Sequence, residues 1–121
     1  MSLTVTLVPV LSDNYSYILH DEATGRVGVV DPGDAAPIQA ALDAAGWTVA
    51  QILNTHHHGD HIDGNAALAA GTGAVVAGPE ADRHRIPTLG IGLGDGDTYR
   101  LGATEFTVIA TPGHTSGQIA F

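Results

Sequence analysis

The chain has 121 residues and a mass of 12.3 kDa, which fits one domain over residues 1–121 and excludes a second domain of ordinary size. Hydrophobic residues make up 44% and charged residues 14%, a balance that can build a core and is unlike that of a disordered chain. Thirteen acidic residues face four basic ones, and the net charge of −9 excludes the basic surface that nucleic acid or an anionic membrane would need.

Two N-terminal segments favour strands. Apolar residues and Thr interleave over residues 3–10, and a similar pattern over 15–19 follows the turn residues 12–14, so a hairpin is predicted. Residues 26–30 predict a third strand, which the Asp-Pro-Gly sequence at 31–33 ends because Pro fixes φ and Gly accepts positive φ. Tyr15 and Tyr17 in the second strand are interpreted as core residues, with site lining as the alternative.

A helix is predicted over residues 35–45, where apolar side chains recur on one face. Asp34 is its expected N-cap and Gly46 its expected left-handed C-cap. A short strand at 49–53 then leads into a polar cluster, and residues 65–70 predict a second, short helix.

The second half of the chain favours strands. A strand is expected at 74–77, and residues 78–97, with Gly at every second position from 90 to 96, are interpreted as a surface loop without regular structure. Residues 98–101 and 104–111 predict a hairpin around Gly102. Residues 119–121 begin a strand that the sequence does not finish, and such an open sheet edge favours self-association.

The residues that carry chemistry fall in two places. Five of the seven histidines lie in one loop and in one later turn, while His20 and His84 lie elsewhere and are interpreted as structural. In an extended segment side chains alternate, so two histidines of the loop point the same way and could share a metal with the later one. The alternative is a surface loop with incidental metal affinity. The candidates are His56, His57, His58, Asp60, His61 and His114.

Without Cys, any metal site must use nitrogen and oxygen ligands. His56, His58 and His114 could form a three-nitrogen cradle for a catalytic zinc, and Asp60 with His61 could begin a second metal position. His57 faces away by its parity and is expected to support the ligands. The hydroxyls of Thr55 and Thr115 stand beside ligand positions, where we expect them to fix the loops.

The motif THHHGDH at 55–61 resembles the HxHxDH signature of the metallo-β-lactamase superfamily, and TPGHTSG at 111–117 resembles its next metal motif. LSDNY at 11–15 and VDPG at 30–33 look like glyoxalase II, the hydroxyacylglutathione hydrolase family. The resemblance implies an α/β fold of the αβ/βα sandwich type, of which this chain supplies roughly the first half. By position it implies that His56, His58 and His114 hold one metal, and that Asp60 and His61 hold the second.

The family places a bridging Asp and a further His beyond the position of Phe121. Gln118 stands where glyoxalase II often has His, and Asp63 where Gly is frequent, which are departures from this subgroup.

The predicted chemistry is metal-dependent hydrolysis. Two Zn²⁺ ions, with Fe or Mn as alternatives, would lower the pKa of a bridging water toward ~7 and stabilise the oxyanion formed by its attack on a carbonyl. Asp60 is then a catalytic residue as a metal ligand. A thioester suits this site because its leaving thiol has a pKa of ~8.5. The resemblance implies hydrolysis of S-lactoylglutathione to glutathione and lactate.

Two other functions stay open. One is a persulfide dioxygenase with a single iron, and the other is an inactive metal-binding fragment that needs the missing C-terminal part. The expected partner is a small-molecule glutathione thioester, with neither nucleic acid nor membrane. Since the chain has no leader-like segment and no apolar run of ~18 residues, a cytoplasmic location is predicted. No substrate-binding residue is assigned, and Arg83 and Arg85 are interpreted as solvated loop residues.

Overall fold

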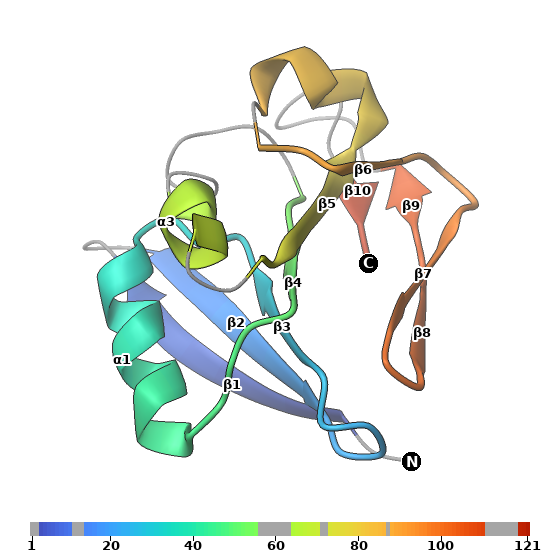
Figure 1. Cartoon of the computed structure of the whole chain (residues 1–121). Helices are drawn as coiled ribbons and strands as arrows, with labels where there is room; N and C mark the ends of the chain where they lie inside the picture. Colours follow the sequence, from blue (N-terminus) through green and yellow to red (C-terminus); the bar gives the residue numbers. More distant parts are fainter. Residues whose placement is uncertain (1–2, 11–13, 56–63, 71–72, 87, 111–118) are drawn as a thin grey trace.

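The computed structural model describes residues 3–10, 14–55, 64–70, 73–86, 88–110 and 119–121. Its main feature is a six-stranded sheet in the order β1-β2-β3-β4-β5-β6 (Figure 1). The first three strands pair antiparallel, and β3 to β6 pair parallel. The strands are β1 Leu3–Val10, β2 Asn14–Asp21, β3 Val27–Val30, β4 Gln51–Leu53, β5 Val75–Pro79 and β6 Ile91–Leu93.

Helices α1, Ala35–Ala45, and α3, Asn65–Ala70, cover one face of this sheet (Figure 1). The Asp34 side chain accepts a hydrogen bond from the amide of Ala36 and caps α1. Gly46 ends the helix with φ 73°, a left-handed conformation that Gly adopts without steric cost. The caps and the bounds of α1 are therefore those that the sequence predicts.

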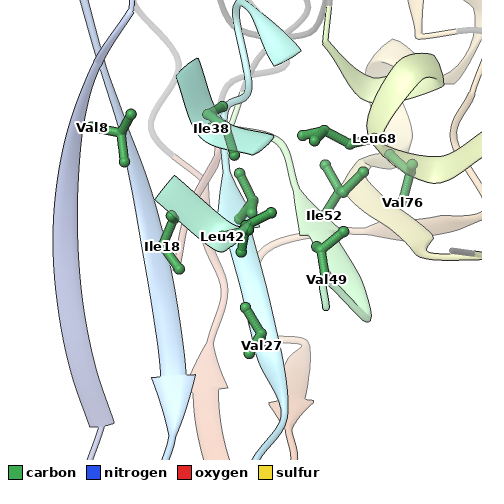
Figure 2. Packing of buried hydrophobic residues seen from close by; sticks show 10 residues of the cluster. Val8, Ile18, Val27, Ile38, Leu42, Val49, Ile52, Leu68 and Val76 are labelled. Carbon is green, nitrogen blue, oxygen red and sulfur yellow. The ribbon is translucent and has the colours of Figure 1, made fainter. Parts of the chain in front are cut away.

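The core between the helices and the sheet is aliphatic. Ile38 and Leu42 of α1 and Leu68 of α3 point toward the sheet, where they meet side chains such as Ile52 and Val76 (Figure 2). Ile38, Leu42 and Ile52 are fully buried. Burying a side chain of this size contributes about 1.5–3 kcal/mol, so this layer fixes α1 and α3 on the sheet.

A second core lies on the opposite face. Alternation along the strands sends Leu19, Leu53 and Ala77 to this side, next to residues of the first core. They pack against Tyr99, Leu101, Val108 and Ile119. These residues belong to the hairpin β7 Thr98–Leu101 with β8 Thr104–Thr107, and to the region of β9 Ile109–Ala110 paired antiparallel with β10 Ile119–Ala120.

The structure confirms most predicted elements, and it corrects two elements and the assignment of one residue. Residues 78–97 are not an irregular loop, because they hold a 3₁₀ helix, Glu80–Arg85, and strand β6, which pairs with β5. The strand predicted at 104–111 is divided into β8 and β9, which belong to different sheets. Tyr17 is not a core residue, since 38% of it is exposed. Within the residues described, no helix has the length and apolar character to cross a membrane.

Candidate metal centre

The predicted metal ligands lie outside the described residues, so the structure describes the framework at the ends of the two segments that carry them. The first segment, 56–63, leaves Thr55 after β4 and enters α3 through Gly64. The second, 111–118, runs between β9 and β10. The predicted residues outside the described part are His56, His57, His58, Asp60, His61, His114 and Thr115.

Thr55 is held at the exit of β4 by a carboxylate from a neighbouring strand. Its amide donates to Oδ1 of Asp31 at 2.8 Å, and its hydroxyl donates to Oδ2 of the same residue at 2.6 Å. Asp31 directly follows β3, and the carboxyl ends of parallel strands β3 and β4 lie at the same edge of the sheet. Two hydrogen bonds to one buried carboxylate fix both the backbone and the side chain of Thr55.

Asp31 itself has an unusual backbone. Its φ is 51°, and it is the one residue other than Gly with positive φ in the described part of the chain. The surroundings hold this conformation, because the Asp31 amide donates to the carbonyl of Leu53 at 2.8 Å and the Ser16 hydroxyl donates to the Asp31 carbonyl at 2.7 Å. Such strain persists where the structure enforces it, and it commonly marks a functional site.

A pair of buried amides spans the two ends of the first segment. Nδ2 of Asn65 donates to Oδ1 of Asn54 at 2.7 Å, and Nδ2 of Asn54 donates back to Asn65 at 3.3 Å. Asn65 also donates to the Thr88 hydroxyl at 3.1 Å. Neither Asn is more than 1% exposed. Because buried amides are costly to leave unpaired, this pair holds the end of β4 and the start of α3 together.

Gly64 brings the start of α3 against the turn after β3. Its amide donates to the carbonyl of Pro32 at 2.7 Å. A Cβ at this position would stand 2.6 Å from the Pro32 carbonyl oxygen and 3.1 Å from the amide nitrogen of Ala35. These neighbours are backbone atoms, so only Gly permits this approach.

One hydrogen bond joins the described residues that border the two segments with the predicted ligands. The amide of Ile119 donates to the carbonyl of Thr55 at 2.9 Å. Thr55 is bonded covalently to the first residue of segment 56–63, and Ile119 to the last residue of segment 111–118. The residue before the first segment and the residue after the second therefore meet at the carboxyl edge of the parallel strands, where ligands bind in open α/β sheets. A donor set of imidazoles and a carboxylate without thiolates fits Zn²⁺, Fe²⁺ or Mn²⁺.

The described residues contain no alternative metal site, since no group of three or more His, Cys, Asp or Glu side chains lies together among them. His20 stacks on Trp47, with ring centroids 4.4 Å apart and planes 4° from parallel. His84 is exposed on the 3₁₀ helix. The stacking of His20 fits the predicted structural role, whereas the exposure of His84 does not support one for that residue.

Residues 10–121 match the family described as the metallo-beta-lactamase superfamily. The chain belongs to this superfamily. Its similarity to hydroxyacylglutathione hydrolases covers nearly all of it: 50% identity over 98% of the chain to the protein of Methylococcus capsulatus, and 54% over 97% to that of Jannaschia sp.. In both comparisons the matched part is 46% of the relative, so this superfamily member spans about half the length of those relatives.

Solved structures agree with the fold of this superfamily member. The BLEG-1 B3 metallo-beta-lactamase superposes with a TM-score of 0.85 at 23% identity, over 96% of this chain and 65% of the other. ETHE1 from Myxococcus xanthus gives a TM-score of 0.77 at 29% identity, over 98% of this chain and 52% of the other. The expected metallo-β-lactamase fold is confirmed.

Sequence reasoning missed three positioning residues of this superfamily member. It assigned Asp31 to a turn and gave no role to Asn54 or Asn65. Two signals were present: a polar residue at the end of each of two apolar strands, and an Asn on either side of the histidine loop. Neither signal says which partner each side chain meets, because the partners come from other elements.

Proposed function

We propose that this chain carries the metal-binding half of a metal-dependent thioester hydrolase of the glyoxalase II type. The observation that carries the proposal is the hydrogen bond between Ile119 and Thr55, which anchors both histidine segments at one point. Identity of about 50% to hydroxyacylglutathione hydrolases supports the same activity for the protein to which this sequence belongs.

In this proposal His56, His58 and His114 hold the first metal, and Asp60 and His61 contribute to the second. A bound Zn²⁺ pair would supply a water that ionises near neutral pH, and its positive charge would stabilise the developing oxyanion. Asp60 acts as a metal ligand, with no nucleophilic role for a side chain. Thr55, fixed by Asp31, sets the direction in which the chain enters the first segment. His57 and Thr115 support the ligands.

The proposed substrate is a small glutathione thioester such as S-lactoylglutathione, cleaved to glutathione and lactate. Its leaving group departs as a thiolate with a pKa of ~8.5, so the chain needs no strong general acid. The net charge of −9 does not attract such an anion over long range. Recognition of the glutathione group therefore has to come from local contacts.

The second candidate is a metal-binding fragment without activity of its own. This candidate is favoured because the chain matches only 46% of the length of the Methylococcus capsulatus relative. If residues beyond this half supply further ligands, the 121-residue chain alone would bind one metal ion and would not turn over substrate.

The decisive test is the metal content of the purified chain with and without His58. We expect His58→Ala to lose the ion bound at the first position, because one of three nitrogen ligands is removed. His84→Ala is the matched control, since His84 is exposed on the 3₁₀ helix, and it should keep the metal. Elemental analysis gives the count and identity of the ions. Unchanged metal content in His58→Ala would contradict the ligand assignment.

Activity is measured as thiol release from S-lactoylglutathione. Two zinc ions per chain with thiol release would support hydrolysis by this chain itself. One ion without release would favour the fragment. Iron as the bound metal, together with oxygen consumption on a glutathione persulfide, would replace the hydrolase proposal with the dioxygenase.

A further inference from the structure

A cavity of about 420 Å³ lies at the end of the sheet opposite to Thr55, the residue before the first histidine segment. It is lined by residues at the amino ends of β4, β5 and β6, by Arg26 before β3, and by β7 of the hairpin. Gln51, the first residue of β4, stands at this end, whereas Thr55 leaves the other end. The cavity is therefore separate from the candidate metal centre.

Two of the four cationic side chains of the sequence line this cavity, Arg26 and Arg100. Such a concentration is unexpected in a chain of net charge −9. The guanidinium of Arg26 makes no hydrogen bond or ion pair with the part of the chain that the structure describes, while Arg100 pairs with Glu105 at 3.3 Å in an exposed position. An exposed pair of this kind is weak, so both cations are available to an anion.

The Tyr99 side chain also lines the cavity. Nε2 of Gln51 donates to the Tyr99 hydroxyl at 2.7 Å and to the carbonyl of Arg100 at 2.8 Å. The Tyr99 oxygen accepts in this contact, so its own proton can be donated to a ligand. Burial raises the pKa of Tyr99, which keeps that proton in place at neutral pH.

Apolar side chains line part of the cavity. Val75 and Ile91 line it and are 42% and 38% exposed, and they are among the few large hydrophobic side chains exposed in the described residues. Exposed apolar surface beside convergent polar groups is typical of a small-molecule site.

The acidic groups near the cavity do not neutralise its two arginines. Asp21 lies behind Gly102, which lines the cavity, but its carboxylate is inaccessible to solvent and accepts hydrogen bonds from Thr24, Ala103 and Thr104. Glu105 touches Arg100 and leaves Arg26 unengaged.

We propose that this cavity binds a small organic anion, a carboxylate or phosphate ester, whose charged group meets Arg26, Arg100 and Tyr99 and whose apolar part rests on Val75 and Ile91. The site is independent of the proposed hydrolase function. In this site, side chains at the amino end of the sheet bind the anion, and no metal ion is needed.

The test is a titration of the ¹⁵N-labelled chain with phenyl phosphate, with phenol as the uncharged counterpart. We expect saturable shifts at Ala50, Gly102 and the Gln51 side-chain amide with phenyl phosphate and none with phenol. Arg26→Gln should weaken binding by about tenfold or more, because a charge-assisted hydrogen bond is lost. Arg83→Gln is the matched control, since Arg83 pairs with Glu80 outside the cavity, and it should leave binding unchanged.

Three results would overturn the proposal. Shifts confined to Thr55 and Gly64 would place the anion at the metal centre. If Arg26→Gln bound phenyl phosphate as tightly as the unchanged chain, Arg26 would not contact the charged group. If the chain bound inorganic phosphate as tightly as phenyl phosphate, Val75 and Ile91 would not contact the apolar part of the ligand.

Discussion

Single side chains fix the framework around the candidate metal centre, and Thr55 is the clearest case. Its hydroxyl and amide meet the two oxygens of Asp31. In Thr55→Val the shape is nearly kept and the hydroxyl is lost, which leaves a buried carboxylate oxygen without that donor. We expect the free energy of unfolding to fall by about 1–3 kcal/mol, measured by urea denaturation. Thr107→Val, at an exposed site on β8, is the control and should change little.

Gly64 makes the second residue-scale prediction. A Cβ at 2.6 Å from the Pro32 carbonyl oxygen cannot be accommodated by rotating a side chain, so Gly64→Ala has to move backbone at the entry of α3. The expected cost is about 1–3 kcal/mol of unfolding free energy, with weaker metal binding. Gly90→Ala is the matched control, because its Cβ would make only an ordinary contact, at 3.5 Å from the carbonyl oxygen of Val76. Equal stability of the two variants would contradict the close approach.

At the scale of elements, one carboxylate docks the β7–β8 hairpin on the six-stranded sheet. Asp21 at the end of β2 accepts from the Thr104 hydroxyl at 2.6 Å and the Ala103 amide at 3.0 Å, and from the Thr24 hydroxyl at 2.6 Å. The hydrogen bond from Thr104, with those from Thr24 and Ala103, lowers the pKa of Asp21 from 3.8 to about 2.

This carboxylate predicts acid sensitivity. The folded-state pKa lies below the unfolded one, so the unfolded chain takes up the proton first as the pH falls. The stabilisation is present above about pH 4 and is lost between about pH 4 and 2. Asp21→Asn should remove this part of the pH dependence and Thr104→Val should reduce it, as measured by urea denaturation across this range. An unchanged dependence of the unfolding free energy on pH in Asp21→Asn would contradict this role of the Asp21 carboxylate.

Elements with strong local signals were predicted closely, and the others were not. Helix α1 has the predicted bounds because its cap, its apolar face and its C-terminal Gly are all local. Strand β6 was missed because Gly92 stands at its centre and the strand exists through pairing with β5. The sequence predicts one strand in place of β8 and β9 because their separation also depends on pairing. The partner of β9 is β10, which lies beyond residues 111–118.

At the scale of the whole molecule, one face of β1 and β2 carries exposed apolar side chains. Val5, Leu7 and Tyr17 are 52%, 55% and 38% exposed. Leu7 and Tyr17 are opposite each other, and Val5 is opposite Leu19 of the second core, so all lie on one face. The chain spans about half the length of its relatives, and this face continues the second core.

The exposed face predicts self-association of the 121-residue chain. Covering Val5 and Leu7 removes apolar surface from water at roughly 25 cal/mol per Å², which favours contact between copies. We expect the apparent mass in light scattering to rise with concentration, and to rise less for the double variant Val5→Thr, Leu7→Thr. Thr4→Ser is the control on the same strand. A chain that stays monomeric throughout would contradict the prediction. Association through the sheet edge at residues 119–121 also stays a prediction.

The sequence by itself determined the superfamily, the hairpin, helix α1 and the candidate ligands, because these depend on short motifs and on periodicity within one segment. Tertiary structure alone decided that Asp31 holds Thr55, that Ile119 meets Thr55, and that two arginines share a cavity with Tyr99. The physical reason is that these contacts join segments far apart in sequence: Asp31 and Thr55 are 24 positions apart, and Arg26 precedes the segment with Tyr99 and Arg100 by more than 70 positions. Only packing of the strands brings such residues together.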